Sequence, residues 1–206
     1  MGAVEEAVNA LKAGGLVVLP TDTVYGLAAT PYHEAPARRI ARLKGRPEST
    51  PIALLGSTVD VVLELVPELR GRDATIARAL LPGPYTLVLA NPARRYPWLN
   101  GERPDTIGVR VADLPARAQR VLDAVGAVAA TSANEPGEPP AASLDEVPER
   151  IRPGCGAALD GGRLAGSPST VIDFTGEEPV VLRDGAGEAG TAIARVHDVL
   201  AAMRAA

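Results

Sequence analysis

The chain contains little cysteine, histidine, lysine or aromatic residue. Its single cysteine, Cys155, excludes an internal disulfide and a cysteine-based structural zinc site. The two histidines, His33 and His197, are too few for a zinc hydrolase of the usual type. Of the 21 basic residues only Lys12 and Lys44 are lysines, so a lysine in a candidate site is unusual for this chain. We therefore expect no metal held by the protein's own side chains.

Long apolar runs are also missing. The longest uncharged stretch, residues 79–93, is interrupted by three prolines and a glycine, and it falls short of the roughly 18 residues that a membrane span needs. The N-terminus carries two acids, Glu5 and Glu6, where a secretory signal would carry a basic cluster. These absences predict a cytoplasmic protein with no membrane association.

Composition and charge favour one globular domain over residues 1–206. Apolar residues make up 46% of the chain and charged residues 22%, which is far from the composition of a disordered chain. The 21 glycines and 19 prolines predict many turns. The net charge of −4 argues against a protein that coats nucleic acid, although a local basic groove remains possible.

Apolar spacing alternates between strand and helix patterns, which favours an α/β domain. Short apolar runs predict strands at residues 16–19, 51–55, 85–90, 106–111, 127–131, 170–174 and 179–183. Helical spacing predicts helices at residues 4–11, 34–44, 59–66, 74–81, 115–125, 143–151 and 191–203. The helix at 143–151 is predicted from a capping box of Ser143 and Glu146.

Two segments combine small residues with cations that could hold an anion. Lys44 and Arg46 stand where the helix at 34–44 ends, although cations there can also satisfy the helix dipole. Arg110 lies inside the otherwise apolar strand at 106–111, and a charge there must be paired or bind a ligand, because an uncompensated one costs several kcal/mol.

Two further segments follow predicted strands. Residues 20–27 carry polar side chains directly after a buried strand, where open α/β sheets bind ligands, but an ordinary turn is an equal alternative. Residues 131–134 open a proline-rich loop, and Asn134 could equally be a turn residue.

Other patterns carry little functional weight. Residues 185–190 spell G-x-G-x-x-G, but a dinucleotide fold needs a following strand with an acid about 20 residues on, and the chain ends at Ala206. Cys155 has no neighbouring histidine or second cysteine, which predicts an inert thiol. Tyr96 and Trp98 could stack on a base, but one such pair is weak support for RNA binding.

Taken in order, seven segments resemble the YrdC-like family, the L-threonylcarbamoyladenylate (threonylcarbamoyl-AMP) synthases. They are PTDTVYGLAA at 20–29, LKGRP at 43–47, LLPGPYTLVL at 80–89, TIGVRV at 106–111, TSAN at 131–134, STVID at 169–173 and VLRDG at 181–185. The resemblance implies a twisted mixed β-sheet with flanking helices around a large, positively lined cavity. It also implies that L-threonine, bicarbonate and ATP, with Mg²⁺ accompanying ATP, give threonylcarbamoyl-AMP and pyrophosphate.

The resemblance also implies roles for individual residues. The family's catalytic tetrad falls on Lys44, Arg46, Ser132 and Asn134. Its threonine-binding positions fall on Thr23, Arg110 and Ser169, and its ATP-binding positions on Arg46, Thr50, Thr106, Ser132 and Arg183. Departures from the family pattern include Thr50 for asparagine, Leu55 for histidine, Pro140 for serine and Asp184 for proline, and they leave the tetrad intact.

The product would pass to a downstream threonylcarbamoyl-transferase complex that modifies the adenosine beside the tRNA anticodon. The resemblance also allows weak contact with tRNA or double-stranded RNA. The main alternative is a paralog of the same fold that binds nucleotide or double-stranded RNA without physiological synthase activity. The segment Arg183-Asp184-Gly185 resembles that paralogous branch. A third reading is a carbamoyl-transfer module like that of hydrogenase-maturation proteins.

Overall fold

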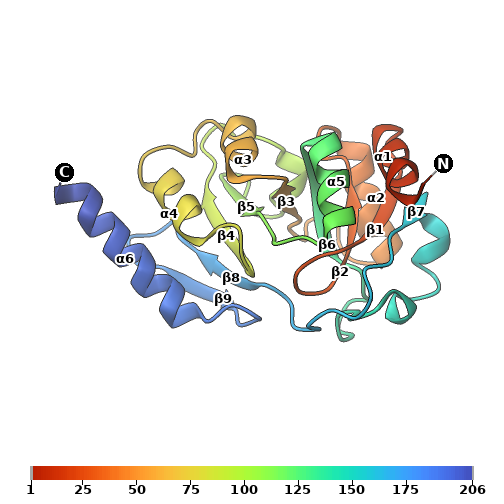
Figure 1. The fold of residues 1–206 in the computed structure, drawn as a ribbon. Coiled ribbons are helices and arrows are strands. Elements are labelled where there is room, and N and C mark those ends of the chain that lie inside the picture. Colours follow the sequence, from red (N-terminus) through yellow and green to blue (C-terminus); the bar gives the residue numbers. More distant parts are fainter. Residues whose placement is uncertain (1, 206) are drawn as a thin grey trace.

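A twisted, nine-stranded mixed sheet runs through residues 2–205, the part of the chain that the computed structural model describes (Figure 1). The strand order is β7-β1-β2-β6-β3-β5-β4-β8-β9. The bounds of the strands are Leu16–Pro20 (β1), Tyr25–Ala29 (β2), Ala53–Gly56 (β3), Tyr85–Ala90 (β4), Thr106–Arg110 (β5), Ala127–Ser132 (β6), Ala157–Ala158 (β7), Thr170–Asp173 (β8) and Val180–Arg183 (β9). The pairs β1–β7, β3–β5 and β4–β8 are parallel and the others are antiparallel, so the predicted mixed α/β class is confirmed.

Helices cover both faces of this sheet, but unequally. In the described part of the chain the α-helices are Ala3–Lys12 (α1), Glu34–Lys44 (α2), Val59–Leu65 (α3), Arg72–Leu80 (α4), Ala116–Val125 (α5) and Ala189–Ala205 (α6). On one face α2, α3, α4 and α6 contribute to the larger apolar core, with Ile40, Val62 and Ile76 among its buried members. On the other face α1 and α5 form a smaller core through residues such as Leu11 and Val121.

The face that carries α1 and α5 is only partly covered by them. Their core reaches β1, β2, β6 and, through Leu55, β3, whereas further along the sheet Gly108 of β5, Val88 of β4 and Val171 of β8 line a cavity. Figure 1 shows α5 in front of β6 and β2, with α6 beside α4 at the opposite end of the molecule. The cavity thus lies on the part of the sheet that α1 and α5 leave open.

The predicted helix at 143–151 is wrong. Only a single 3₁₀ turn, Leu144–Glu146, forms there, and the Ser143 side chain makes no capping hydrogen bond. The chain becomes extended at Val147 (ψ 124°), because the ring of Pro148 disfavours helical geometry in the residue before it. The Glu146 carboxylate accepts instead from the backbone N–H of Ala142 at 2.7 Å.

Two strands were missing from the sequence prediction. β2 begins inside the segment at 20–27, for which the sequence predicts a loop, and it continues to Ala29. All five of its residues are buried, so it shows no alternation of polar and apolar residues. β7 has only two residues and gives no pattern at all. The paired strands predicted at 170–174 and 179–183 are confirmed as β8 and β9, with a register shift between Val171 and Ile172.

Candidate active site

The open part of the sheet holds a cavity of about 670 Å³. The alternation of β5 explains its floor: Thr106, Gly108 and Arg110 face the cavity, while Ile107 and Val109 are fully buried in the larger core. Strand alternation therefore places an arginine in the cavity with no break in the apolar core beneath it.

The charged residues that line the cavity are three arginines, Arg103, Arg110 and Arg183, and one acid, Glu102. Arg103 is held at the rim by an ion pair to Asp173 at 2.6 Å. The lining is thus more cationic than the chain as a whole, whose net charge is −4.

Arg183 and Ser169 join the end of β9 to the start of β8. The guanidinium Nε and Nη2 atoms of Arg183 donate to the Ser169 carbonyl at 3.0 and 2.8 Å, and Nη2 lies 3.1 Å from the Ser169 hydroxyl. That hydroxyl is also 2.9 Å from the hydroxyl of Thr86 on β4. Burial lowers the pKa of Arg183, so an anion near it would be favoured.

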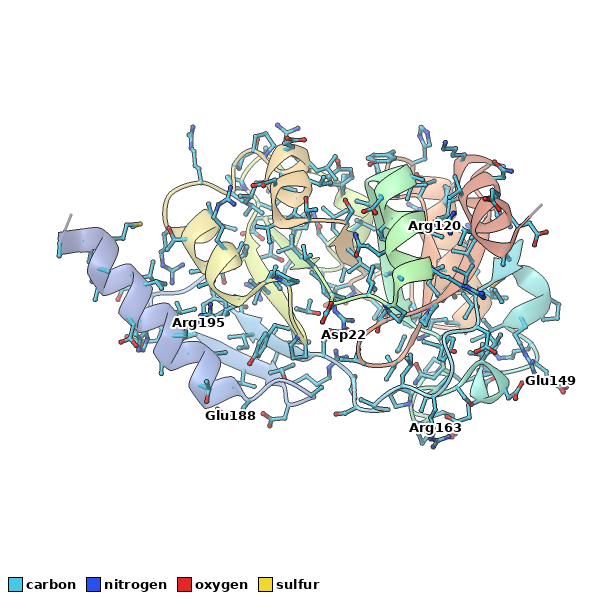
Figure 2. All side chains as sticks on the ribbon, viewed as in Figure 1. Asp22, Arg120, Glu149, Arg163, Glu188 and Arg195 are labelled. Atoms are coloured by element: carbon cyan, nitrogen blue, oxygen red, sulfur yellow. The ribbon has the colours of Figure 1, made fainter. Side chains whose placement is uncertain are left out.

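Arg110 is paired with an acid that the sequence analysis did not assign. Its Nη2 donates to the carboxylate of Asp22 and to the Thr23 hydroxyl, the latter at 2.8 Å. Burial lowers the pKa of Arg110 more than the attraction of Asp22 raises it. Asp22 lies within PTDTVYGLAA, so the motif contains it, but no pattern links it to Arg110. Figure 2 shows Asp22 near the middle of the molecule, with Glu149, Arg163 and Glu188 at its edges.

Lys44 reaches the site because α2 ends sharply. Gly45 adopts a left-handed conformation (φ 67°), and the Arg46 N–H donates to the Ala41 carbonyl, which reverses the chain. The Lys44 ammonium donates to the Ser132 carbonyl at 2.5 Å and to Asn134 Oδ1 at 3.3 Å. Burial, and then the charge of Arg46, lower the pKa of Lys44 to about 7.

Arg46 has unused hydrogen-bonding capacity. Its Nη1 donates to the Thr131 hydroxyl at 3.2 Å, while within residues 2–205 its Nε and Nη2 atoms are buried without a partner, as is Nε of Arg110. Burial lowers the pKa of Arg46 to about 10. Buried donors without partners are uncommon in folded proteins. These three belong to Arg110, which lines the cavity, and to Arg46, which contacts Thr131 of the lining.

The structure brings the implied tetrad together. Lys44 contacts both Ser132 and Asn134, and Arg46 contacts the neighbouring Thr131. The amide nitrogen of Asn134 donates to the Glu138 carbonyl at 2.6 Å, so Asn134 organises the proline-rich loop and also holds Lys44. Asn134 therefore acts both as a turn residue of the loop and as a hydrogen-bond partner of Lys44.

The remaining implied residues surround the same space. Those that line the cavity are Thr50, Thr106, Arg110, Ser132, Ser169 and Arg183. The Thr106 hydroxyl donates to the Arg103 carbonyl at 2.9 Å, so it keeps its oxygen lone pairs for a ligand. Thr23 contacts the cavity through Arg110.

Among residues 2–205, Cys155 and Trp98 lie outside this cluster and do not form a second chemical centre. Burial raises the pKa of the Cys155 thiol to about 11, which agrees with an inert thiol. The Trp98 indole N–H donates to the Pro31 carbonyl at 2.9 Å and its ring meets Tyr96 edge to face. In the part of the chain that is described, no group of three or more histidine, cysteine or acidic side chains could hold a metal ion, and no helix is long and apolar enough to cross a membrane.

Comparison with known proteins identifies the family. The family model for Sua5, YciO and YrdC, described as "Telomere recombination", matches residues 9–185. The chain belongs to this family. It is 36% identical over 181 residues to the threonylcarbamoyl-AMP synthase of Chromohalobacter salexigens, an alignment that covers 85% of this chain and 94% of that protein.

Two solved structures share the fold. The crystal structure of Pyrococcus abyssi Sua5 complexed with L-threonine matches with a TM-score of 0.79 and 33% identity, over 88% of this chain and 54% of that one. Escherichia coli YciO matches with a TM-score of 0.79 and 29% identity, over 90% of each chain. The chain thus spans about half the length of the Pyrococcus Sua5 protein and nearly all of YciO.

Proposed function

We propose that this chain is an L-threonylcarbamoyladenylate synthase, which converts L-threonine, bicarbonate and ATP into threonylcarbamoyl-AMP, pyrophosphate and water. The observation that carries the proposal is a group of four cations. Arg110 and Arg183 line the cavity, while Lys44 and Arg46 contact Ser132 and Thr131 of its lining. Within residues 2–205, guanidinium N–H groups of Arg46 and Arg110 are left without partners. Such groups are stabilised by anionic ligands, and the substrates supply a carboxylate and a triphosphate.

The two ends of the cavity suit the two anions. Arg110, which donates to Thr23, binds the threonine carboxylate, because guanidinium and carboxylate match in a bidentate geometry, and Ser169 of the same cavity lining contributes to the threonine site. Arg46 and Lys44, with Ser132, bind ATP phosphates, and Arg183 neutralises the charge that develops on pyrophosphate. Thr50 and Thr106 complete the ATP side of the cavity.

The reaction needs no protein nucleophile. The threonine amine captures CO₂ from bicarbonate as a carbamate, a carbamate oxygen attacks the α-phosphorus of ATP, and pyrophosphate leaves. The cations hold two anions together against their repulsion and keep them in line, and such positioning can supply roughly 7–11 kcal/mol of the barrier. A reaction without a protein nucleophile agrees with the raised pKa of the Cys155 thiol and with the lack of a catalytic triad motif in the sequence.

Magnesium enters this proposal as part of the ATP complex. Asp22 is the buried acid at the site and is paired with Arg110, so the described side chains offer no carboxylate set for the ion. Phosphate oxygens and water are its expected ligands.

Pyrophosphate release from ATP tests the proposal directly. The purified chain is assayed with magnesium, with and without L-threonine and bicarbonate. We expect release only when both are present, and release independent of threonine would contradict the synthase. The product would feed a cytoplasmic threonylcarbamoyl-transferase complex that modifies tRNA.

A second candidate is a nucleotide- or RNA-binding paralog without physiological synthase activity. The YciO match over 90% of both chains and the Arg183-Asp184 pair favour it. It predicts tight ATP binding with no threonine-dependent pyrophosphate. Any RNA contact would use the basic cavity rim of a chain whose net charge is −4, so binding should be weak and should fall steeply with added salt in a filter-binding assay.

A further inference from the structure

Asp22 is an acid paired with an arginine of the cavity. Its carboxylate forms an ion pair with Arg110, and the two side chains are only 13% and 11% exposed. Within residues 2–205 the structure gives Asp22 no second salt bridge. A cavity meant only to collect anions would be weakened by a carboxylate beside one of its arginines, because that carboxylate repels every anionic ligand.

The local chain holds this carboxylate firmly in place. The Thr21 hydroxyl accepts from the backbone N–H groups of Thr23 and Val24, both at 3.2 Å, and donates to the Val24 carbonyl at 2.7 Å. Backbone N–H groups of Asp22 and Asp113 also point to the Asp22 carboxylate. The turn before β2 therefore holds Asp22 as a fixed group against Arg110, which lines the cavity.

The single arginine does not fully compensate for the burial of this acid. Burial raises the pKa of Asp22 more than the charge of Arg110 and the backbone hydrogen bonds lower it. Arg110 is itself destabilised by burial and retains an unpartnered Nε. Each member of the pair is therefore able to gain from a second partner of opposite charge.

An α-amino acid supplies both charges at once. Its carboxylate and its ammonium are joined to the same carbon, so they can meet an arginine and an aspartate that lie side by side. We propose that Asp22 binds the α-ammonium group of the amino-acid substrate while Arg110 binds its carboxylate. This inference rests on the proposed function and makes Asp22 a specificity-determining residue of the same site.

The pair would then select by charge pattern. A zwitterion gives each residue a partner of opposite charge. A simple carboxylate pairs with Arg110 only, offers Asp22 no ammonium group and is repelled by the Asp22 carboxylate. Asp22 would thus disfavour the binding of phosphate and hydroxy acids at Arg110. The nucleotide phosphates would bind at Lys44 and Arg46 instead. A role limited to orienting Arg110 would affect every carboxylate alike, and this difference makes the two roles separable.

The test compares two ligands that differ only in the ammonium group. L-threonine and (R)-3-hydroxybutanoate are titrated by NMR against the wild-type chain and the Asp22→Asn variant. We expect the substitution to weaken threonine binding by roughly tenfold or more, because it removes a charge-assisted hydrogen bond. Binding of 3-hydroxybutanoate should change by less than about twofold or become tighter, since the repulsion is removed.

Other results overturn the inference. Equal losses for both ligands would mean that Asp22 only orients Arg110, and tighter binding of both would mean that it is merely a competing counter-ion. A wild-type chain that does not bind threonine would overturn the proposed substrate as well. The control is Asp105→Asn, which removes an exposed acid just before β5 and should leave both affinities unchanged. If Asp22→Asn fails to fold, Asp22→Ser carries the same comparison.

Discussion

The Lys44 ammonium and the Ser132 carbonyl are joined by a hydrogen bond of 2.5 Å, although the two residues are 88 positions apart. This contact ties the C-terminal end of α2 to the end of β6. It also keeps a buried cation beside the hydroxyl of Ser132 and the amide of Asn134. The charge of Lys44 is therefore sensitive to whatever anion enters the cavity.

ATP binding should take up a proton at Lys44 above neutral pH. The pKa of Lys44 is about 7, so its side chain is mostly neutral at pH 8 and mostly charged at pH 6. A nearby phosphate favours the charged form and raises this pKa. Calorimetry in buffers of different ionisation heat should therefore show proton uptake at pH 8 and much less at pH 6. Lys44→Arg, charged at both pH values, should lose this uptake, and a wild-type heat independent of buffer at pH 8 would contradict the assignment.

Arg46→Ala should abolish turnover and leave the fold intact. Removal of a preorganised donor to a developing charge typically costs about 100- to 1,000-fold in rate. Because Nε and Nη2 of Arg46 have no partner in the described chain, we expect the melting temperature to stay the same or rise. Arg42→Ala is the matched control, since Arg42 is an exposed arginine in the last turn of α2, four residues before Arg46. Near-normal activity of Arg46→Ala would remove it from the ATP site.

Arg110→Ala should raise the KM for threonine far more than the KM for ATP, because the carboxylate loses its guanidinium partner. The change also leaves the buried Asp22 carboxylate unpaired, which destabilises the protein. The double variant Arg110→Ala, Asp22→Asn should recover stability without recovering threonine affinity. Steady-state kinetics and thermal denaturation measure the two effects separately, and equal changes in both KM values would refute the carboxylate assignment.

Gly108→Leu should block the cavity while the sheet stays folded. A Cβ at Gly108 would meet only Thr86 Cγ2 at 3.8 Å and Ala53 Cα at 3.9 Å, which are ordinary contacts. A longer side chain would extend from the floor of β5 into the ligand space. For Gly108→Leu we expect the ATP affinity measured by calorimetry to fall at least tenfold, with little change in melting temperature. The ATP affinity of Gly108→Ala should lie between those of Gly108→Leu and the wild type. Unchanged affinity in Gly108→Leu would place the nucleotide elsewhere.

Some of the site could be predicted from the sequence because it depends on short-range rules. Arg110 within an apolar strand required a partner or a ligand, and the structure supplies Asp22 and an open cavity. The prediction failed where tertiary burial removed the pattern, as in β2, and where one proline, Pro148, overruled an apparent helix cap.

The sequence by itself determined the turn at Gly45, which ends α2 beside Lys44 and Arg46, and the alternation along β5 that separates Arg110 from the core. Both follow from backbone geometry over a few residues. Only the tertiary structure decided that Asp22 meets Arg110 and that Lys44 meets Ser132. Those pairs come from segments almost 90 residues apart. They form because the strand order places β2, β6, β3 and β5 side by side, and no local pattern encodes that order.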